Sequence, residues 1–144
     1  MPNWCDNHLR IYASDVADLS EFRDKVLSAN KRSILEGLLP LPEEFGEDSH
    51  WRAWTDENWG CKWSDHETNV DVPLTWPFIG DDGQLCEGWI DYFFQTPWCP
   101  PEAGMTRISA MFPKLTFVLG YVEEGVGYCG ASSFAEGERL SEFC

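Results

Sequence analysis

The sequence has few basic residues and no long apolar run. Only ten of its 144 residues are Lys or Arg, against 25 Asp and Glu, so the formal net charge is -15. A field of that sign repels phosphate backbones and anionic membranes. No segment approaches the roughly 18 apolar residues of a membrane span, and no secretory signal pattern opens the chain. We therefore expect a protein that stays in the cytoplasm where it is made and contacts neither nucleic acid nor membrane directly.

The sequence also lacks closely spaced pairs of metal-binding residues. Its six cysteines form no CxxC or CxH pair, which is the usual basis of a structural zinc site. Without a secretory signal, cysteines are better interpreted as reduced thiols than as a disulfide framework. We expect six reduced thiols, no metal and no cofactor. The cysteines are Cys5, Cys61, Cys86, Cys99, Cys129 and Cys144.

The residues that are present indicate a folded body. Apolar residues make up 43% of the chain and aromatic residues 15%, including eight tryptophans. A disordered acidic chain carries far fewer, because it has no apolar surface to offset the entropy of ordering. The length suits one domain, so we expect residues 1–144 to form a single unit.

Hydrophobic periodicity predicts strands and helices in a recognisable order. Ser14 is the expected cap of a helix bearing Val16, Leu19, Phe22, Val26 and Leu27, and Ser33 with Glu36 has capping-box spacing before a shorter helix. Pro100 and Pro101 open a further helix with Met105, Ile108, Met111 and Phe112 as its apolar stripe, and Pro113 ends it. Alternation predicts strands over His8–Ala13, Val70–Phe78, Trp89–Thr96, Leu115–Val122 and Val126–Phe134.

This order matches the split βαβ, ferredoxin-like pattern of the α+β class. We predict an antiparallel sheet of four strands with two helices on one face, lengthened by an extra C-terminal hairpin strand. Pro73 and Pro77 place the second strand at an edge, because proline cannot donate to the ladder. An acidic, tryptophan-rich insert of about 43–69 is expected to be mostly irregular.

Negative charge is concentrated in the middle of the chain. Residues 43–91 contain thirteen acidic residues against Arg52 and Lys62, which is -11 of the total -15. Such a surface suits a basic partner, although long loops also collect solvated charges. The expected acidic binding surface consists of Glu43, Glu44, Glu47, Asp48, Asp56, Glu57, Asp81 and Asp82.

Tryptophans crowd the same region. Trp54, Trp59 and Trp63 either pin a long loop to the core or anchor a protein interface, where Trp is enriched. Base-stacking sites pair aromatic rings with Lys and Arg, whereas acids surround these. An alternative is a ligand or active-site pocket formed by Trp59, Lys62, Trp98, Tyr121 and Glu123.

No group of residues has the spacing of a catalytic site. His66 lies between Asp65 and Glu67, and Cys61 lies beside Lys62, but neither grouping belongs to a motif with a defined geometry. Cys129 sits in a predicted hairpin, where a buried structural thiol is common. We therefore assign no catalytic residue.

Four segments resemble the YubB-like family of phage and plasmid accessory proteins with a ferredoxin-like domain. They are MPNWCDNHLRI at the start, NWGCKW at Asn58–Trp63, TPWCPP at Thr96–Pro101 and FPKLTFVLGYVEEG at Phe112–Gly125. The matched positions are Asn3, Trp4, Cys5, Asn7, Trp59, Gly60, Lys62, Trp63, Thr96, Trp98, Pro101, Tyr121 and Glu123. Ser64 departs from the pattern, which would have an aspartate there.

The resemblance implies the fold and a mobile-element origin, but no specific activity. Combined with the charge, it leads us to expect a non-enzymatic accessory protein that binds a host protein with a basic surface. A nucleic-acid-binding defence protein fits, since carboxylates can stand where phosphates sit, as in an anti-defence DNA mimic such as an anti-CRISPR protein. The alternative is a small-ligand binder or enzyme with the Trp/Lys/Glu pocket.

Overall fold

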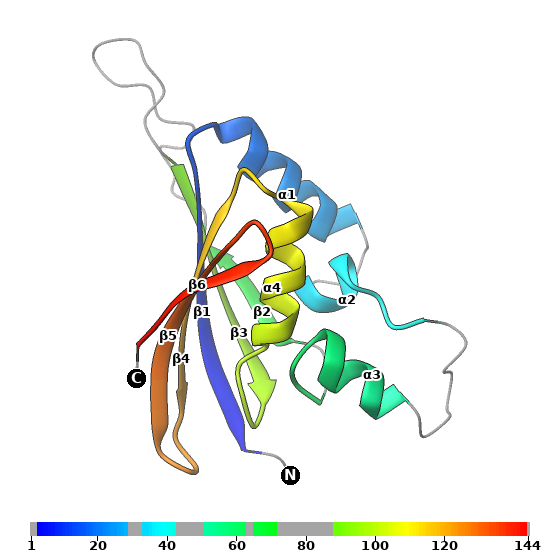
Figure 1. Ribbon diagram of the computed structural model, residues 1–144, viewed down its shortest axis with the longest axis vertical. Coiled ribbons are helices and arrows are strands. Elements are labelled where there is room, and N and C mark those ends of the chain that lie inside the picture. Colours follow the sequence, from blue (N-terminus) through cyan, green and yellow to red (C-terminus); the bar gives the residue numbers. More distant parts are fainter. Residues whose placement is uncertain (1–2, 29–32, 43–50, 63–64, 72–87, 144) are drawn as a thin grey trace.

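The computed structural model describes residues 3–28, 33–42, 51–62, 65–71 and 88–143. Within these ranges ten elements follow one another, with the helices on one side of a twisted sheet (Figure 1). The strands are β1 (Trp4–Ala13), β2 (His66–Asp71), β3 (Gly88–Pro97), β4 (Thr116–Glu123), β5 (Tyr128–Ala135) and β6 (Glu138–Phe143). The helices are α1 (Val16–Ser28), α2 (Ile34–Leu38), α3 (Trp51–Asn58) and α4 (Glu102–Met111).

The strands form one antiparallel sheet in the order β2-β3-β1-β4-β5-β6. Its first four strands have the ferredoxin-like order, in which β1 lies between β3 and β4. Cys5 pairs with Thr96 on one side and with Glu123 on the other. The predicted α+β fold is therefore confirmed, including the shared sheet of β1, β3 and β4, the strands predicted from His8, Trp89 and Leu115.

Alternation along the strands separates a covered face, which packs on the helices, from an open face. On β1 the buried side chains are Cys5, Asn7, Leu9, Ile11 and Ala13, and the residues between them point to the open face. The same period of two places Ile90, Tyr92, Phe94 and Thr96 of β3, and Phe117 and Leu119 of β4, in the core.

The core centres on Phe22 of α1. Its ring meets Tyr92, Phe112 and Phe117 edge to face, with centroids 5.0–5.9 Å apart, an arrangement that aromatic rings prefer. Among the described residues, the hydroxyl of fully buried Tyr92 has no hydrogen-bond partner. Close packing also constrains α4, where a Cβ on Gly104 would lie 2.7 Å from Leu35 Cδ2.

The helix caps partly follow the predictions. Ser33 caps α2 by accepting from the Glu36 amide at 3.2 Å, as its capping-box spacing indicates. At α1 the predicted cap was wrong, because Asp15 rather than Ser14 accepts from the Ala17 amide, at 2.9 Å. Asp and Ser are equally good caps, so sequence alone did not separate the neighbours.

Helix α4 follows Pro101 as predicted, but its apolar stripe is narrower than expected. Met105, Ile108 and Phe112 are buried, whereas Met111 is exposed. Beyond α4, β4 and β5 are shifted by one or two residues from the predicted strands. Gly137, in the turn between β5 and β6, packs against Ala110, so the sheet extension wraps along this helix.

Three elements correct the sequence-based prediction. Residues 43–69 contain α3 and most of β2, so the expected irregular insert was wrong for its described part. Edge strand β2 begins at His66 rather than Val70, and residues 72–87, with Pro73 and Pro77, lie outside the described residues. Strand β6 was missed because Glu138–Phe143 is short and charged and shows little alternation. Within the described ranges, no helix is long and apolar enough to cross a membrane.

Candidate functional site

Within the described part of the chain, the positions matched to the YubB-like pattern gather at one end of the sheet. This is the end where β1 begins and where β3 and β4 finish, because both pairings are antiparallel. Asn7 and Thr96 are buried there, and Gly60 approaches α4, with a virtual Cβ 3.0 Å from the Ala103 nitrogen. We call the hydrogen-bonded residues at this end the motif network, defined as Cys5, Asn7, Thr96, Cys99, Glu123 and Tyr128.

Asn7 links the three segments that meet in the motif network. Its side-chain amide donates to Thr96 Oγ1 at 2.9 Å and to the Cys5 carbonyl at 3.1 Å. The Thr96 hydroxyl then donates to the Cys99 carbonyl at 2.7 Å, and the Cys99 thiol donates to the Gly60 carbonyl at 3.1 Å. This chain of bonds ties the NWGCKW segment to the sheet, and a paired buried amide stabilises the arrangement.

The thiols of the motif network are not activated nucleophiles. Burial raises the pKa of Cys5 to about 12, and the neighbouring Cys99 thiol adds to the rise. Burial likewise raises the pKa of Cys61, the candidate beside Lys62. A reactive cysteine needs a lowered pKa, so Cys5 and Cys61 are structural. Cys5, Cys61, Cys99 and Cys129 form no disulfide, and Cys129 is exposed rather than buried. Cys86 and Cys144 lie outside the described residues.

Glu123 closes the hairpin between β4 and β5. Its side chain is 1% exposed, and its two carboxylate oxygens accept from the amides of Gly125 at 2.6 Å and Val126 at 2.8 Å. Such charge-assisted bonds are stronger than neutral ones. The carboxylate predicted for a ligand pocket therefore holds a turn together.

Asp65 has a structural role that sequence reasoning missed. Its carboxylate accepts from the Ser33 hydroxyl at 2.7 Å and from the amides of Ile34 and Leu35 at 2.9 and 2.8 Å. These bonds satisfy orphan donors at the start of α2 from a residue 30 positions away. Within the described part of the chain, no group of three or more His, Cys, Asp and Glu could hold a metal ion.

Only two residues of the predicted acidic surface are described. Asp56 and Glu57 are both exposed on α3, and Asp56 pairs with Arg52 one turn earlier at 3.1 Å. Glu43, Glu44, Glu47, Asp48, Asp81 and Asp82 lie outside the described residues. The structure therefore places one part of this surface on a helix exposed to solvent.

The described members of the predicted aromatic surface differ in exposure. Trp59 is buried against Trp54, and its indole donates to the Leu39 carbonyl at 2.9 Å. Lys62 and Tyr121 are half-buried, and Trp63 lies outside the described residues. Trp98 is 47% exposed and has a positive φ of 70°. Its amide donates to the Asn3 carbonyl, and its carbonyl accepts from the Tyr128 hydroxyl.

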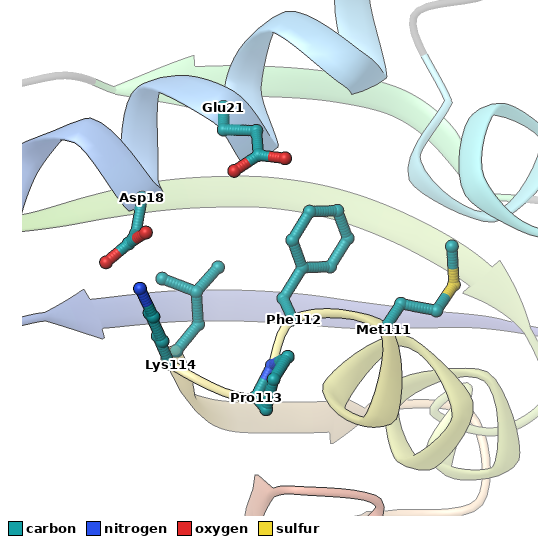
Figure 2. Close-up of a pocket in the computed structure, with 7 residues that line it drawn as sticks. Asp18, Glu21, Met111, Phe112, Pro113 and Lys114 are labelled. Carbon is teal, nitrogen blue, oxygen red and sulfur yellow. The ribbon is translucent and has the colours of Figure 1, made fainter.

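Two cavities lie at the opposite end of the sheet from the motif network. One, of about 180 Å³, is lined by Asp18 and Glu21 of α1 and by residues 111–115. Figure 2 shows the Lys114 side chain directed toward Asp18 across it. A second, of about 290 Å³, is bordered by Tyr12, Lys114, Thr116 and Val118 among others. Neither includes a predicted site residue.

The open face holds an ordered set of side chains that sequence reasoning did not single out. Along β1 and β3, Tyr12 pairs with Trp89, Arg10 with Asp91, and His8 with Phe93. The Arg10 guanidinium donates to both oxygens of Asp91, at 2.6 and 2.9 Å, and His8 lies 3.0 Å from the same carboxylate. Alternation in HLRIY and WIDYFF assigns these residues to one face, but their contacts depend on the strand register.

The charges of Arg10 and Asp91 on the open face neutralise one another. Burial alone would raise the pKa of Asp91, but hydrogen bonds from Arg10 and then His8 outweigh it and hold the pKa below its ordinary value. The same hydrogen bond raises the pKa of Arg10. Both groups stay ionised at neutral pH, and Arg10 is already committed to a partner within the face.

Comparison with known proteins supports the fold and leaves the activity open. A family model described as the ferredoxin-like domain in Api92-like protein matches residues 79–143. A crystal structure of a protein Api92 from Yersinia pseudotuberculosis is similar, with 18% identity and a TM-score of 0.49 over 63% of this chain. The match spans 28% of that protein's chain. No curated protein matches. The chain therefore contains a ferredoxin-like domain similar to that of Api92-like protein.

Proposed function

We propose that this protein is a non-enzymatic accessory protein of the phage and plasmid YubB-like kind, which binds a basic surface of a host protein. The observation that carries the proposal is the charge of -15, of which -11 falls in residues 43–91. A strongly one-signed surface raises the rate of encounter with an oppositely charged partner and helps to fix its orientation. The charge also opposes direct binding to nucleic acid.

The structural roles of Glu123 and Trp59 support a binding role over a pocket. Both carboxylate oxygens of Glu123 accept hydrogen bonds from amides of the turn, and the Trp59 indole N–H donates to the Leu39 carbonyl. Two polar groups of the alternative pocket are therefore used to hold the fold. Glu123 and Trp59 therefore serve the scaffold, which favours the acidic residues as the contact surface.

A nucleic-acid-binding defence protein is the partner class that fits best. Such proteins hold DNA or RNA in basic channels, and a compact acidic body presents carboxylates where phosphates would sit. Occupying the channel would block nucleic acid without any chemistry. The protein would then be an anti-defence inhibitor.

Charge variants of the intact chain test this proposal. In one variant Glu43, Glu44, Glu47, Asp48, Asp81 and Asp82 become Gln or Asn, which changes the net charge from -15 to -9. A matched control neutralises six acids elsewhere, namely Asp18, Glu21, Asp24, Glu124, Glu136 and Glu138, with the same change in charge. Each protein is used to capture host proteins, which are identified by mass spectrometry.

We expect the wild type and the control to capture a basic nucleic-acid-binding protein, and the first variant to lose it. Added DNA should displace the protein, and salt should weaken the contact because it screens exposed charges. Equal loss from both variants would show unspecific charge attraction. Retained capture by the first variant, insensitive to salt, would contradict the mimic.

A further inference from the structure

We propose that the open face of the sheet docks an extended, arginine-bearing segment of the basic partner. The inference rests on the function proposed above, since it takes the partner to be basic. It adds a second contact, apart from the acidic residues, and names the side chains that make it. The surface consists of Asp6, His8, Arg10 and Tyr12 of β1 together with Trp89, Asp91, Phe93 and Gln95 of β3.

These side chains form successive cross-strand pairs along the two central strands. Tyr12 faces Trp89, Arg10 faces Asp91, His8 faces Phe93, and Asp6 faces Gln95. Residues two apart on a strand are about 6.6 Å apart, so the surface has the repeat of an extended peptide. A segment lying along it would meet one pair with every second residue.

The surface exposes aromatic rings that are already fixed in place. Phe93 is 42%, Trp89 37% and Tyr12 36% exposed. The His8 ring stacks on Phe93 at 4.5 Å with an interplanar angle of 15°, and the Arg10 guanidinium lies 5.3 Å from the Trp89 ring centroid. Large apolar side chains gathered on one exposed face mark an interaction site, and ordered side chains lose little entropy when a partner binds.

The chemistry of the face selects a cation. Aromatic rings attract guanidinium groups through the negative faces of their π-systems, and the Arg10–Trp89 pair is an example within this chain. Arg10 itself is bound to both oxygens of Asp91, so the pair carries no net charge that would oppose an incoming arginine. A single strand of nucleic acid would need unpaired Lys or Arg beside the rings and would meet a chain of charge -15.

Charge also orients the segment along the face. Lys114 borders the cavity at the Tyr12 end, whereas the exposed carboxylate Asp6 lies beyond His8 at the other end. Asp6 accepts from Gln95 at 2.9 Å, which holds the carboxylate next to the Phe93 pair. An arginine of the partner should therefore stack at Phe93 and face Asp6.

The test varies the rings and keeps the net charge. The full chain is titrated, at physiological salt, with a ten-residue peptide of alternating Arg and Gly. A Trp89→Leu/Phe93→Leu variant keeps both sites apolar but removes the ring faces. A Met111→Ala/Val126→Ala variant loses exposed apolar groups from α4 and the β4–β5 turn, and serves as the control. Circular dichroism verifies that each variant is folded.

We expect the leucine variant to bind the peptide about tenfold more weakly than the wild type, since it loses two ring faces that can form exposed cation–π contacts. The control should bind like the wild type, and the Trp89 indole N–H resonance should shift during the titration. Equal binding by the leucine variant would overturn the proposal. So would tighter binding of a ten-nucleotide thymidine strand, or a dimer that the leucine variant cannot form.

The outcomes separate this inference from the proposed function. The acidic-surface test changes charge and keeps the rings, whereas the peptide test changes the rings and keeps the charge. If host-protein capture needs the acids of residues 43–82 while the leucine variant binds normally, the docking surface is wrong and the proposed function stands. If no basic protein is captured although the peptide binds through the rings, the proposed function is wrong.

Discussion

The two faces of the sheet are built from the same strands but are held together by different forces. On the covered face, Tyr92 and Phe94 pack among apolar side chains, and even a hydroxyl without a partner is tolerated there. On the open face, their neighbours Asp91 and Phe93 are fixed by an ion pair and a stacked ring. The covered face supplies most of the stability. The open face presents ordered groups to solvent, as a binding surface requires.

Adjacent phenylalanines on β3 give the largest expected contrast between the faces. Phe94→Ala should lower the free energy of unfolding by about 3–5 kcal/mol, because it removes a buried ring and leaves a cavity. Phe93→Ala should cost less than about 1 kcal/mol, since that ring is 42% exposed, against 3% for Phe94. Urea unfolding of both variants measures the difference. Similar costs would mean that the open face is also covered.

Adjacent glutamates at the end of β4 give the next contrast. Glu123→Gln should cost about 1–2 kcal/mol, because a carboxamide replaces a carboxylate that accepts from two amides. Glu124→Gln should change stability by less than about 0.5 kcal/mol, since Glu124 is exposed. Thermal unfolding of the pair is the measurement. A stable Glu123→Gln protein would show that the turn holds without the charge.

Protonation of Asp91 in acid should lower the free energy of unfolding by about 1 kcal/mol, which is the smallest of these effects. The pKa of Asp91 is lowered in the folded state. Its stabilising effect is therefore complete above the unfolded pKa of about 3.9 and is lost as the pH falls through the lower folded value. Asp91→Asn should destabilise the protein at pH 6 and reduce the further loss on acidification. Asp24→Asn, at an exposed position, is the control, and urea midpoints from pH 6 to pH 2.5 are compared.

Local patterns in the sequence were enough to predict much of this fold. Alternation located β1, β3 and β4, and Ser33 with Glu36 marked the start of α2. The Asp65 cap could not be predicted, because it depends on a residue brought close only by the tertiary structure. Helix α3 was not predicted, because the tryptophan-rich, acidic sequence around it suggested an irregular loop. For the candidate site, alternation separates Asp91 from Tyr92, but the register that sets Arg10 beside Asp91 is a property of the assembled sheet.

The position of β1 between two distant strands has a consequence for how the chain folds. Cys5 of β1 pairs with Thr96 and Glu123, which lie 91 and 118 positions later in the sequence. By contrast, β4, β5 and β6 are joined by short turns. Pairings between distant residues form slowly, because a long loop must close first. During synthesis β1 leaves the ribosome long before either neighbour exists, with its apolar residues uncovered. We therefore expect the β4–β5–β6 meander to form early and the insertion of β1 to complete the sheet.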